Sequence, residues 1–327
     1  MNTTKPEKWQ QALTDLITCP EELLSLLELD QSAGIIEAAK TFPLKVPRGY
    51  VNRMQKGNPN DPLLRQVLPL GLELTIVPGY DKDPLQESQV NPVPGLLHKY
   101  HGRVLVTLTS ACAIHCRFCF RRHFPYHDNN PGLRGWDNLF AYIQNDPSIS
   151  EVILSGGDPL TVSDHLLKLF STSLSSISHV KRLRIHTRLP IVLPERITAS
   201  LLTWLRELEL EAIVVVHANH PQEINEEVRD ALFLLRNASV HLLNQTVLLK
   251  GINDEVSILA LLSETLFDAG VLPYYLHVLD KVEGAAHFDL PIERARELHR
   301  ALAHRLPGYL VPRLVCEEAG ELAKTLV

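Results

Sequence analysis

The chain has 327 residues, of which 45% are hydrophobic and 21% are charged, so it can bury a sizeable core. Its 32 basic and 38 acidic residues make it mildly acidic, which excludes the basic surface that nucleic-acid-binding proteins use to displace counterions. We therefore expect no nucleic-acid partner.

The sequence has no apolar run near the 18 to 20 residues, roughly, that cross a bilayer. Its first ten residues, MNTTKPEKWQ, are polar and lack the apolar centre of a signal peptide. We expect a cytoplasmic protein with no membrane partner.

The first hundred residues differ from the rest in their sequence pattern. Residues 5–40 contain short amphipathic patterns that predict helices, and residues 41–100 are rich in proline and glycine, which favours irregular structure. We predict an N-terminal helical and irregular cap over residues 1–100 and a core domain over residues 101–327.

The core domain alternates short β-branched runs with helical stretches, which predicts repeated βα units and a parallel sheet. The expected strands are 103–109, 151–155, 182–187, 212–217, 240–249, 273–278 and 309–315. The expected helices are 133–146, 163–177, 195–208, 222–236, 254–269 and 291–305. Polar residues follow most of these strands, at the end where parallel barrels place their chemistry.

Three cysteines follow the first strand in the segment TSACAIHCRFCFRRHF. Cys112, Cys116 and Cys119 supply three soft thiolate ligands, which suit an iron–sulfur cluster with one iron left open. The alternative is zinc, with His115 or His123 as the fourth ligand. Zinc sites more commonly use two separated pairs of ligands than one tight triplet, so we favour the cluster.

A glycine turn follows the second strand. Gly156 and Gly157 permit positive φ and a close approach of a ligand to the backbone, and Asp158 follows them. Read alone, the segment is an ordinary βα turn. His217 ends the fourth strand and Gln245 lies within the fifth, and both suit either a bound molecule or the polar rim of a barrel.

Six segments stand in an order that points to a family. They are CAIHCRFCFRRHF, LSGGDPL, RLPIVLPERIT, HANHPQEI, NQTVLLKGIND and PYYLHVLDKVEGAAHF. Over residues 90–327 the chain resembles lysine 2,3-aminomutases, which are radical S-adenosylmethionine (SAM) enzymes. It is most similar to the branch that makes (R)-β-lysine for modifying translation elongation factor P. The catabolic branch extends further and adds zinc-binding cysteines.

The resemblance implies an α/β fold, a radical SAM partial (β/α)6-type barrel with an N-terminal helical and irregular extension. It implies a [4Fe-4S] cluster on the three cysteines and SAM bound near the glycine turn, His217 and Gln245. It also implies pyridoxal 5′-phosphate (PLP) on Lys324. The chain lacks the glycine run that precedes this lysine in catabolic members, so Lys250 and Lys281 stay as alternatives.

The resemblance further implies residues that bind the substrate L-lysine. Arg121 matches the arginine that binds the carboxylate, and a planar guanidinium suits that group. Asp280 matches one of two acids that bind the ε-ammonium, and Glu317 stands where catabolic enzymes have the second, an aspartate. Arg103 matches an arginine near the PLP phosphate, or is a surface residue beside a strand.

The activity implied is an isomerase reaction that moves the α-amino group of L-lysine to C3. The product would serve elongation factor P and its lysyl ligase, the electron donor has no readable motif, and relatives that self-associate make a homo-oligomer plausible. The alternatives are a free-standing aminomutase of amino-acid metabolism, acting on lysine or another amino acid, and a non-catalytic zinc-binding protein.

Overall fold

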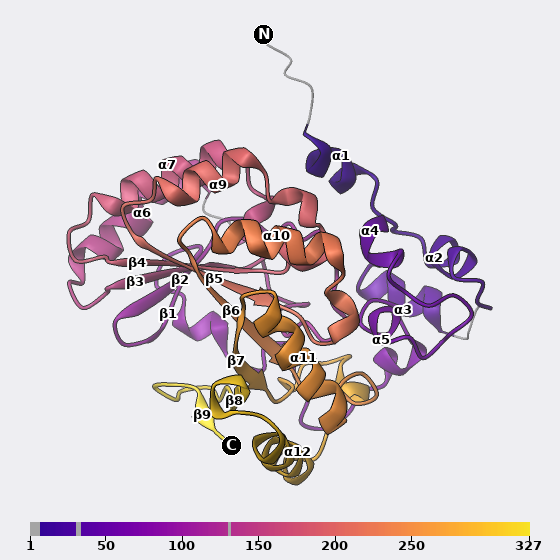
Figure 1. The fold of residues 1–327 in the computed structure, drawn as a ribbon. Coiled ribbons are helices and arrows are strands. Elements are labelled where there is room, and N and C mark those ends of the chain that lie inside the picture. Colours follow the sequence, from indigo (N-terminus) through magenta and orange to yellow (C-terminus); the bar gives the residue numbers. More distant parts are fainter. Residues whose placement is uncertain (1–6, 31–33, 130–131) are drawn as a thin grey trace.

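The computed structural model describes residues 7–30, 34–129 and 132–327, and the centre of this described part is a nine-stranded sheet (Figure 1). The strands cross the sheet in chain order. Strands β2 to β8 are parallel, and β1 and β9 add antiparallel at the two edges. They are β1 (Leu96–Tyr100), β2 (Arg103–Thr107), β3 (Glu151–Ser155), β4 (Arg182–Thr187), β5 (Glu211–His217), β6 (His241–Val247), β7 (Leu272–His277), β8 (Arg313–Cys316) and β9 (Thr325–Leu326).

Helices connect the parallel strands and cover the outer face of the sheet (Figure 1). They are α6 (Gly132–Asn145), α7 (Asp164–Ser175), α8 (Leu189–Val192), α9 (Ala199–Arg206), α10 (Glu226–Arg236), α11 (Val256–Asp268) and α12 (Ile292–Arg305). Side-chain caps fix three of the starts, because Ser163, Thr198 and Asn225 each accept a backbone N–H from the first turn. The expected α/β fold with a partial (β/α)6-type barrel is confirmed.

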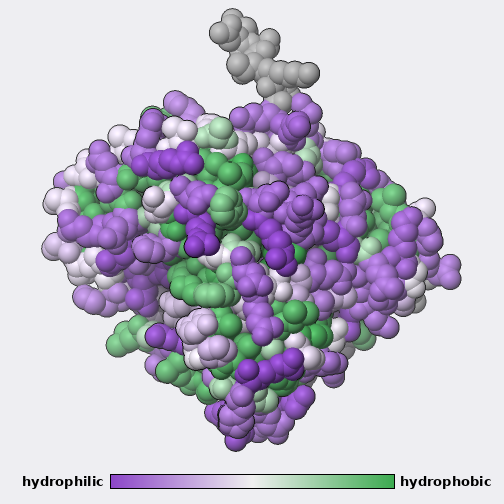
Figure 2. Space-filling model, viewed as in Figure 1, coloured by the Kyte–Doolittle hydropathy of each residue, from purple (hydrophilic) through white to green (hydrophobic). Residues whose placement is uncertain are grey.

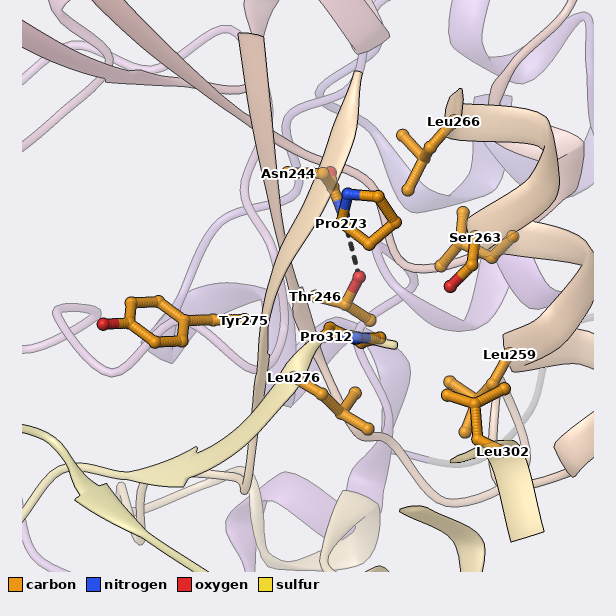
Figure 3. Close-up of a pocket in the computed structure, with 11 residues that line it drawn as sticks. Asn244, Thr246, Leu259, Ser263, Leu266, Pro273, Tyr275, Leu276, Leu302 and Pro312 are labelled. Carbon is orange, nitrogen blue, oxygen red and sulfur yellow. Dashed lines mark hydrogen bonds between the residues drawn. The ribbon is translucent and has the colours of Figure 1, made fainter. Parts of the chain in front are cut away.

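Successive side chains of each strand face opposite sides of the sheet. Figure 3 shows this on β6 and β7, where Thr246 and Leu276 point toward α11 and Tyr275 points to the other side. A cavity of about 10 Å³ lies between α11 and the sheet, with room for roughly one water molecule. It is lined by none of the predicted site residues.

The N-terminal extension packs onto the barrel through one continuous apolar core. Trp9, Tyr50 and Leu63 belong to the same buried cluster as Val104 and Val152 of the sheet. The division into residues 1–100 and 101–327 stays a prediction, and residues 5–6 and 31–33 of the expected helical stretch lie outside the described residues. The helices of the extension are α1 (Lys8–Thr14), α2 (Pro20–Leu26), α3 (Ile35–Thr41), α4 (Arg48–Val51) and α5 (Pro62–Arg65).

The sheet curls until its two ends approach each other. Within the described structure β1 and β9 do not pair, so the barrel is partial. The side chain of Lys99 on β1 nevertheless reaches Glu317, directly after β8, at 2.9 Å. The carboxyl ends of the parallel strands therefore surround one shared region.

The outer surface is mainly polar on the face shown in Figure 2, with smaller apolar patches between hydrophilic side chains. Across the described residues we find no helix that combines the length and apolar character needed to cross a membrane.

Candidate active site

The loop after β2 carries the clustered cysteines. Cys112, Cys116 and Cys119 are free thiols and are partly buried. Burial raises the pKa of Cys112, and it raises the pKa of Cys119 to about 11, with the neighbouring cysteines adding to both shifts. The thiols are thus close enough to influence one another. Coordination to a metal would remove their protons and offset this cost.

The two histidines considered as zinc ligands have other contacts. The Nδ1 atom of His115 lies 2.8 Å from the Pro43 carbonyl oxygen, and its ring stacks on Phe42. The Nε2 atom of His123 lies 3.3 Å from the Glu283 carbonyl oxygen. In the part of the chain that the structure describes, no group of three or more His, Cys, Asp or Glu side chains is arranged to hold a metal ion.

The N-terminal extension forms hydrogen bonds with the cysteine loop. The backbone N–H of His115 donates to the Lys45 carbonyl (2.9 Å), and that of Arg117 donates to the Gln66 carbonyl (2.9 Å). The guanidinium of Arg117 donates to both carboxylate oxygens of Glu73, at 2.9 and 2.5 Å. Both side chains of this pair are fully buried. The extension therefore fixes the position of the cysteines without supplying one.

The glycine turn after β3 also forms a hydrogen bond with the cysteine loop. The N–H of Asp158 donates to the Ala111 carbonyl at 2.7 Å, and a Cβ on Gly157 would lie 2.5 Å from that oxygen. Gly156 has φ +106°, which favours glycine. The carboxylate of Asp158 fastens β3 to the end of β4, because it accepts hydrogen bonds from the Thr187 hydroxyl and from the backbone N–H groups of Leu160, Arg188 and Leu189.

Three imidazoles with buried Nε2 atoms line the inner side of the sheet. His217 ends β5 beside Gln245 of β6, and its ring lies 5.8 Å from that of His186 on β4. Within the described structure, the Nε2 atoms of these two rings and of His277 on β7 are buried and lack hydrogen-bond partners. Burial lowers the pKa of His217 to about 3 and the pKa values of His186 and His277 well below their usual range. All three rings are uncharged at neutral pH.

Arg121 is buried and already holds a carboxylate. Its Nε and Nη2 atoms each donate to Glu87 at 2.7 Å, and Nη1 donates to the Ser155 hydroxyl at 3.1 Å. Burial opposes the positive charge, but Glu87 raises the pKa of Arg121 above its usual range. The edge formed by the two terminal nitrogens, Nη1 and Nη2, retains N–H groups for a second carboxylate.

Glu317 joins two lysines at the open side of the barrel. It accepts hydrogen bonds from Lys99 at 2.9 Å and from Lys324, whose amine also lies 5.9 Å from the ring centre of Tyr275. Burial opposes ionisation of Glu317, but Lys324 and Lys99 hold its pKa well below the usual range. Burial, followed by the charge of Glu317, raises the pKa of Asp280 to about 7.

The remaining predicted residues divide between this group and the surface. Arg103 lies over the ring of Tyr100 at 4.7 Å, and the pKa of Tyr100 is raised by burial and by Glu317. Arg103 therefore borders the same group of charges. Lys250 and Lys281 are exposed, whereas Lys324 is partly buried against Glu317.

Four residues of this region were not predicted from the sequence. Glu87 and Lys99 lie before residue 100, where proline- and glycine-rich sequence gives no periodic signal. His186 and His277 lie at or near the carboxyl ends of β4 and β7. This position could have indicated them, because parallel barrels place their functional residues there.

Comparison with known proteins identifies the family. The model of the radical SAM superfamily matches residues 106–262. L-lysine 2,3-aminomutase of Escherichia coli (strain K12) is 50% identical to the chain, over 99% of this chain and 96% of that protein. The chain belongs to the lysine 2,3-aminomutase family. It is accordingly an isomerase of the radical SAM superfamily, as the resemblance predicted.

The other lysine 2,3-aminomutases differ in how far they match. L-lysine 2,3-aminomutase of Haemophilus influenzae is 46% identical, over 98% of this chain and 95% of its own length. That of Clostridium subterminale is 37% identical, over 98% of this chain and 77% of its own length. Among solved structures, a radical SAM methyltransferase from Sphaerobacter thermophilus aligns with a TM-score of 0.48 and 16% identity over 68% of each chain.

Lysine 2,3-aminomutases of the radical SAM superfamily use a [4Fe-4S] cluster, SAM and PLP. The residues of this chain fit these groups. Three free thiols on one loop suit a cluster, the unpartnered imidazole nitrogens can bind a further molecule, and the Lys324 amine lies among the charged residues of the inner side. Family membership favours the cluster over zinc.

Proposed function

We propose that this chain converts L-lysine into (R)-β-lysine in a PLP-dependent reaction, with PLP held by Lys324. The observation that carries the proposal is the charge arrangement around this lysine. Lys99 lies 3.5 Å from Glu87, the partner of Arg121, and 2.9 Å from Glu317, the partner of Lys324. A guanidinium for a carboxylate and acids for an ammonium thus lie within one connected group.

The substrate has the complementary charges. In the proposal Arg121 binds the α-carboxylate through its free edge, and Asp280 and Glu317 bind the ε-ammonium. An ammonium between these acids would favour the ionised form of Asp280, which burial and the charge of Glu317 now oppose. The binding groups sit on structure fixed by the barrel, so they orient lysine along the line from Arg121 to Glu317.

The cofactors would be held by the residues around this line. Cys112, Cys116 and Cys119 would hold the cluster, the Gly156–Asp158 turn with His217 and Gln245 would border SAM, and Arg103 would approach the PLP phosphate. When bound, these groups supply hydrogen abstraction and radical stabilisation. The protein's own part is to bind and orient lysine and to exclude water.

The test is anaerobic incubation of reconstituted protein with SAM, PLP, dithionite and L-lysine. Chiral mass spectrometry should find (R)-β-lysine together with 5′-deoxyadenosine, and Cys116→Ala should make neither. 5′-Deoxyadenosine without β-lysine would contradict the substrate. Absence of both from protein with an intact cluster would contradict the catalytic proposal.

We also propose that the product serves elongation factor P through its lysyl ligase. The support is sequence similarity: the chain matches two relatives over 95% or more of their length and the Clostridium protein over 77%. Deleting the gene should remove β-lysine from hydrolysed elongation factor P, and added β-lysine should restore it. Unchanged β-lysine in the hydrolysate would favour a free-standing aminomutase in amino-acid metabolism.

A further inference from the structure

Arg188 follows β4 and contacts a cysteine of the loop. Its Nη1 atom donates to Cys116 Sγ at 2.6 Å, and its Nη2 atom donates to Glu223 at 2.9 Å and to Gln66 at 2.5 Å. The side chains of Arg188 and Glu223 are 6% and 0% exposed. The guanidinium is therefore a buried positive charge between a cysteine sulfur and a buried carboxylate.

Several elements hold this arginine in place. Its own backbone N–H donates to Asp158 at 2.7 Å, so the residue is fastened to the glycine turn. The carboxylate of Glu223 is fixed in turn by the backbone N–H groups of Asn219 (2.8 Å) and His220 (3.0 Å). Arg188 is held through its backbone by Asp158 and through its side chain by Glu223, so its guanidinium stays in contact with the sulfur.

Hydrogen bonds to the sulfurs and nearby charge are among the factors that set the potential of an iron–sulfur cluster. A donor or a positive charge stabilises the reduced state, which carries one more electron, and a negative charge opposes it. Both effects are strong in a buried site, where water screens them little.

We infer that Arg188 raises the reduction potential of the cluster through its contact with Cys116, and that Glu223 limits this effect. The inference rests on the proposed role of Cys116 as a cluster ligand. Arg188 is a positioning residue: it keeps its proton, makes no bond to substrate, and acts through the sulfur when one electron from an external one-electron donor reduces the cluster.

The two partners predict shifts of opposite sign. Replacing Arg188 by methionine removes the donor and the positive charge, so the potential should become more negative. Glu223→Gln keeps Arg188 but removes its countercharge, so the potential should become more positive. A merely structural role would disturb the site in both variants without a reason for opposite signs.

The experiment is an anaerobic redox titration of reconstituted protein without SAM or lysine, following the electron paramagnetic resonance signal of the reduced cluster. Arg196→Met is the matched control, because Arg196 is also a fully buried arginine but pairs with Asp164. Its potential should equal that of the unmodified protein.

Opposite shifts in Arg188→Met and Glu223→Gln, with the control unchanged, support the inference. An unchanged potential in either variant, or shifts of the same sign, overturn it. If Arg188→Met does not fold, the direction measured for Glu223→Gln alone decides. Full iron content in Cys116→Ala would instead overturn the ligand assignment, which is a failure of the proposed function.

Discussion

At the scale of single residues, the charged side chains of the site neutralise one another in a continuous series. Arg121, Glu87, Lys99, Glu317 and Lys324 alternate in sign, and each contacts the next. The two acids satisfy cations that would otherwise be buried unpaired, which is costly. The substrate must therefore bind among existing ion pairs, and residues that bind no cofactor can govern affinity by orienting its ligands.

Glu87→Gln tests whether Glu87 orients Arg121 for the substrate carboxylate. We expect the KM for lysine to rise roughly tenfold, because a hydrogen bond between charged groups is worth about 1.5 to 3 kcal/mol and orients the arginine. The effect on kcat should be smaller. Steady-state kinetics measures KM and kcat. Asp164→Asn is the control, because it removes the acidic partner of another buried arginine, Arg196. Equal effects in both variants would show a general loss of folding.

Asp280 predicts a pH dependence of stability. Its pKa is about 7 in the folded protein against a usual 3.8, so this carboxyl favours folding at low pH, and the contribution is lost as pH rises through about 7. Asp280→Asn should therefore raise the melting temperature of the cofactor-free protein at pH 8.5, and raise it less at pH 5, where only part of the contribution has been lost. Calorimetry checks this, and equal changes at both pH values would contradict it.

The proposed role of Lys324 in holding PLP is tested by the visible absorption of protein-bound PLP. Lys324→Ala should abolish the visible band of protein-bound PLP while leaving the iron content unchanged, because the cysteines lie on a different loop. Lys281→Ala is the control, since Lys281 is exposed. A band that persists in Lys324→Ala would assign PLP to another lysine.

At the scale of elements, hydrophobic periodicity predicted the six βα units but missed some boundaries. The helix expected over 195–208 begins at Ala199, because Thr198 caps it and residues 194–196 form a 3₁₀ turn. The strand expected over 309–315 begins at Arg313, since residues 308–310 also form a 3₁₀ turn. Local turn and cap geometry overrides a pattern that counts only apolar residues.

The site could be predicted only in part for a related reason. The cysteines are close in sequence, so their spacing alone reveals a ligand set. Glu87 meets Arg121 across 34 positions, and Lys99 meets Glu317 across 218. Contacts at such separation depend on how the sheet curls, which no local pattern encodes.

The contact between two turns gives a prediction at this scale. A Cβ on Gly157 would lie 2.5 Å from the Ala111 carbonyl oxygen, so Gly157→Ala should displace the cysteine loop and reduce bound iron several-fold. Gly308→Ala is the control, because nothing lies within 4 Å of its added Cβ. Iron analysis after anaerobic reconstitution measures both. Normal iron in Gly157→Ala would show that the loop tolerates the shift.

At the scale of the whole molecule, the extension is bonded to the loop that carries the clustered cysteines. The sequence indicated helices there, but gave no sign that Glu73 would meet Arg117 beneath the cysteines. Such a pair joins segments that are separate in sequence, through side chains that are charged and therefore expected at the surface. Its burial became visible only with the packed structure.

Glu73→Gln tests this connection. Breaking a buried pair costs about 3 to 5 kcal/mol, so the melting temperature should fall by several degrees and bound iron should decrease. Arg48→Gln is the control, because Arg48 forms exposed pairs worth about 1 kcal/mol or less. Differential scanning calorimetry and iron analysis measure both variants. Equal small effects would show that the extension does not support the loop.

The contact between Lys99 and Glu317 has a consequence for access to the site. It bridges the seam between the two ends of the sheet by charge, where a closed barrel would use backbone hydrogen bonds. A latch of this kind can part without unpairing a strand. Opening the seam would therefore break one ion pair and leave the backbone hydrogen bonds of the sheet intact.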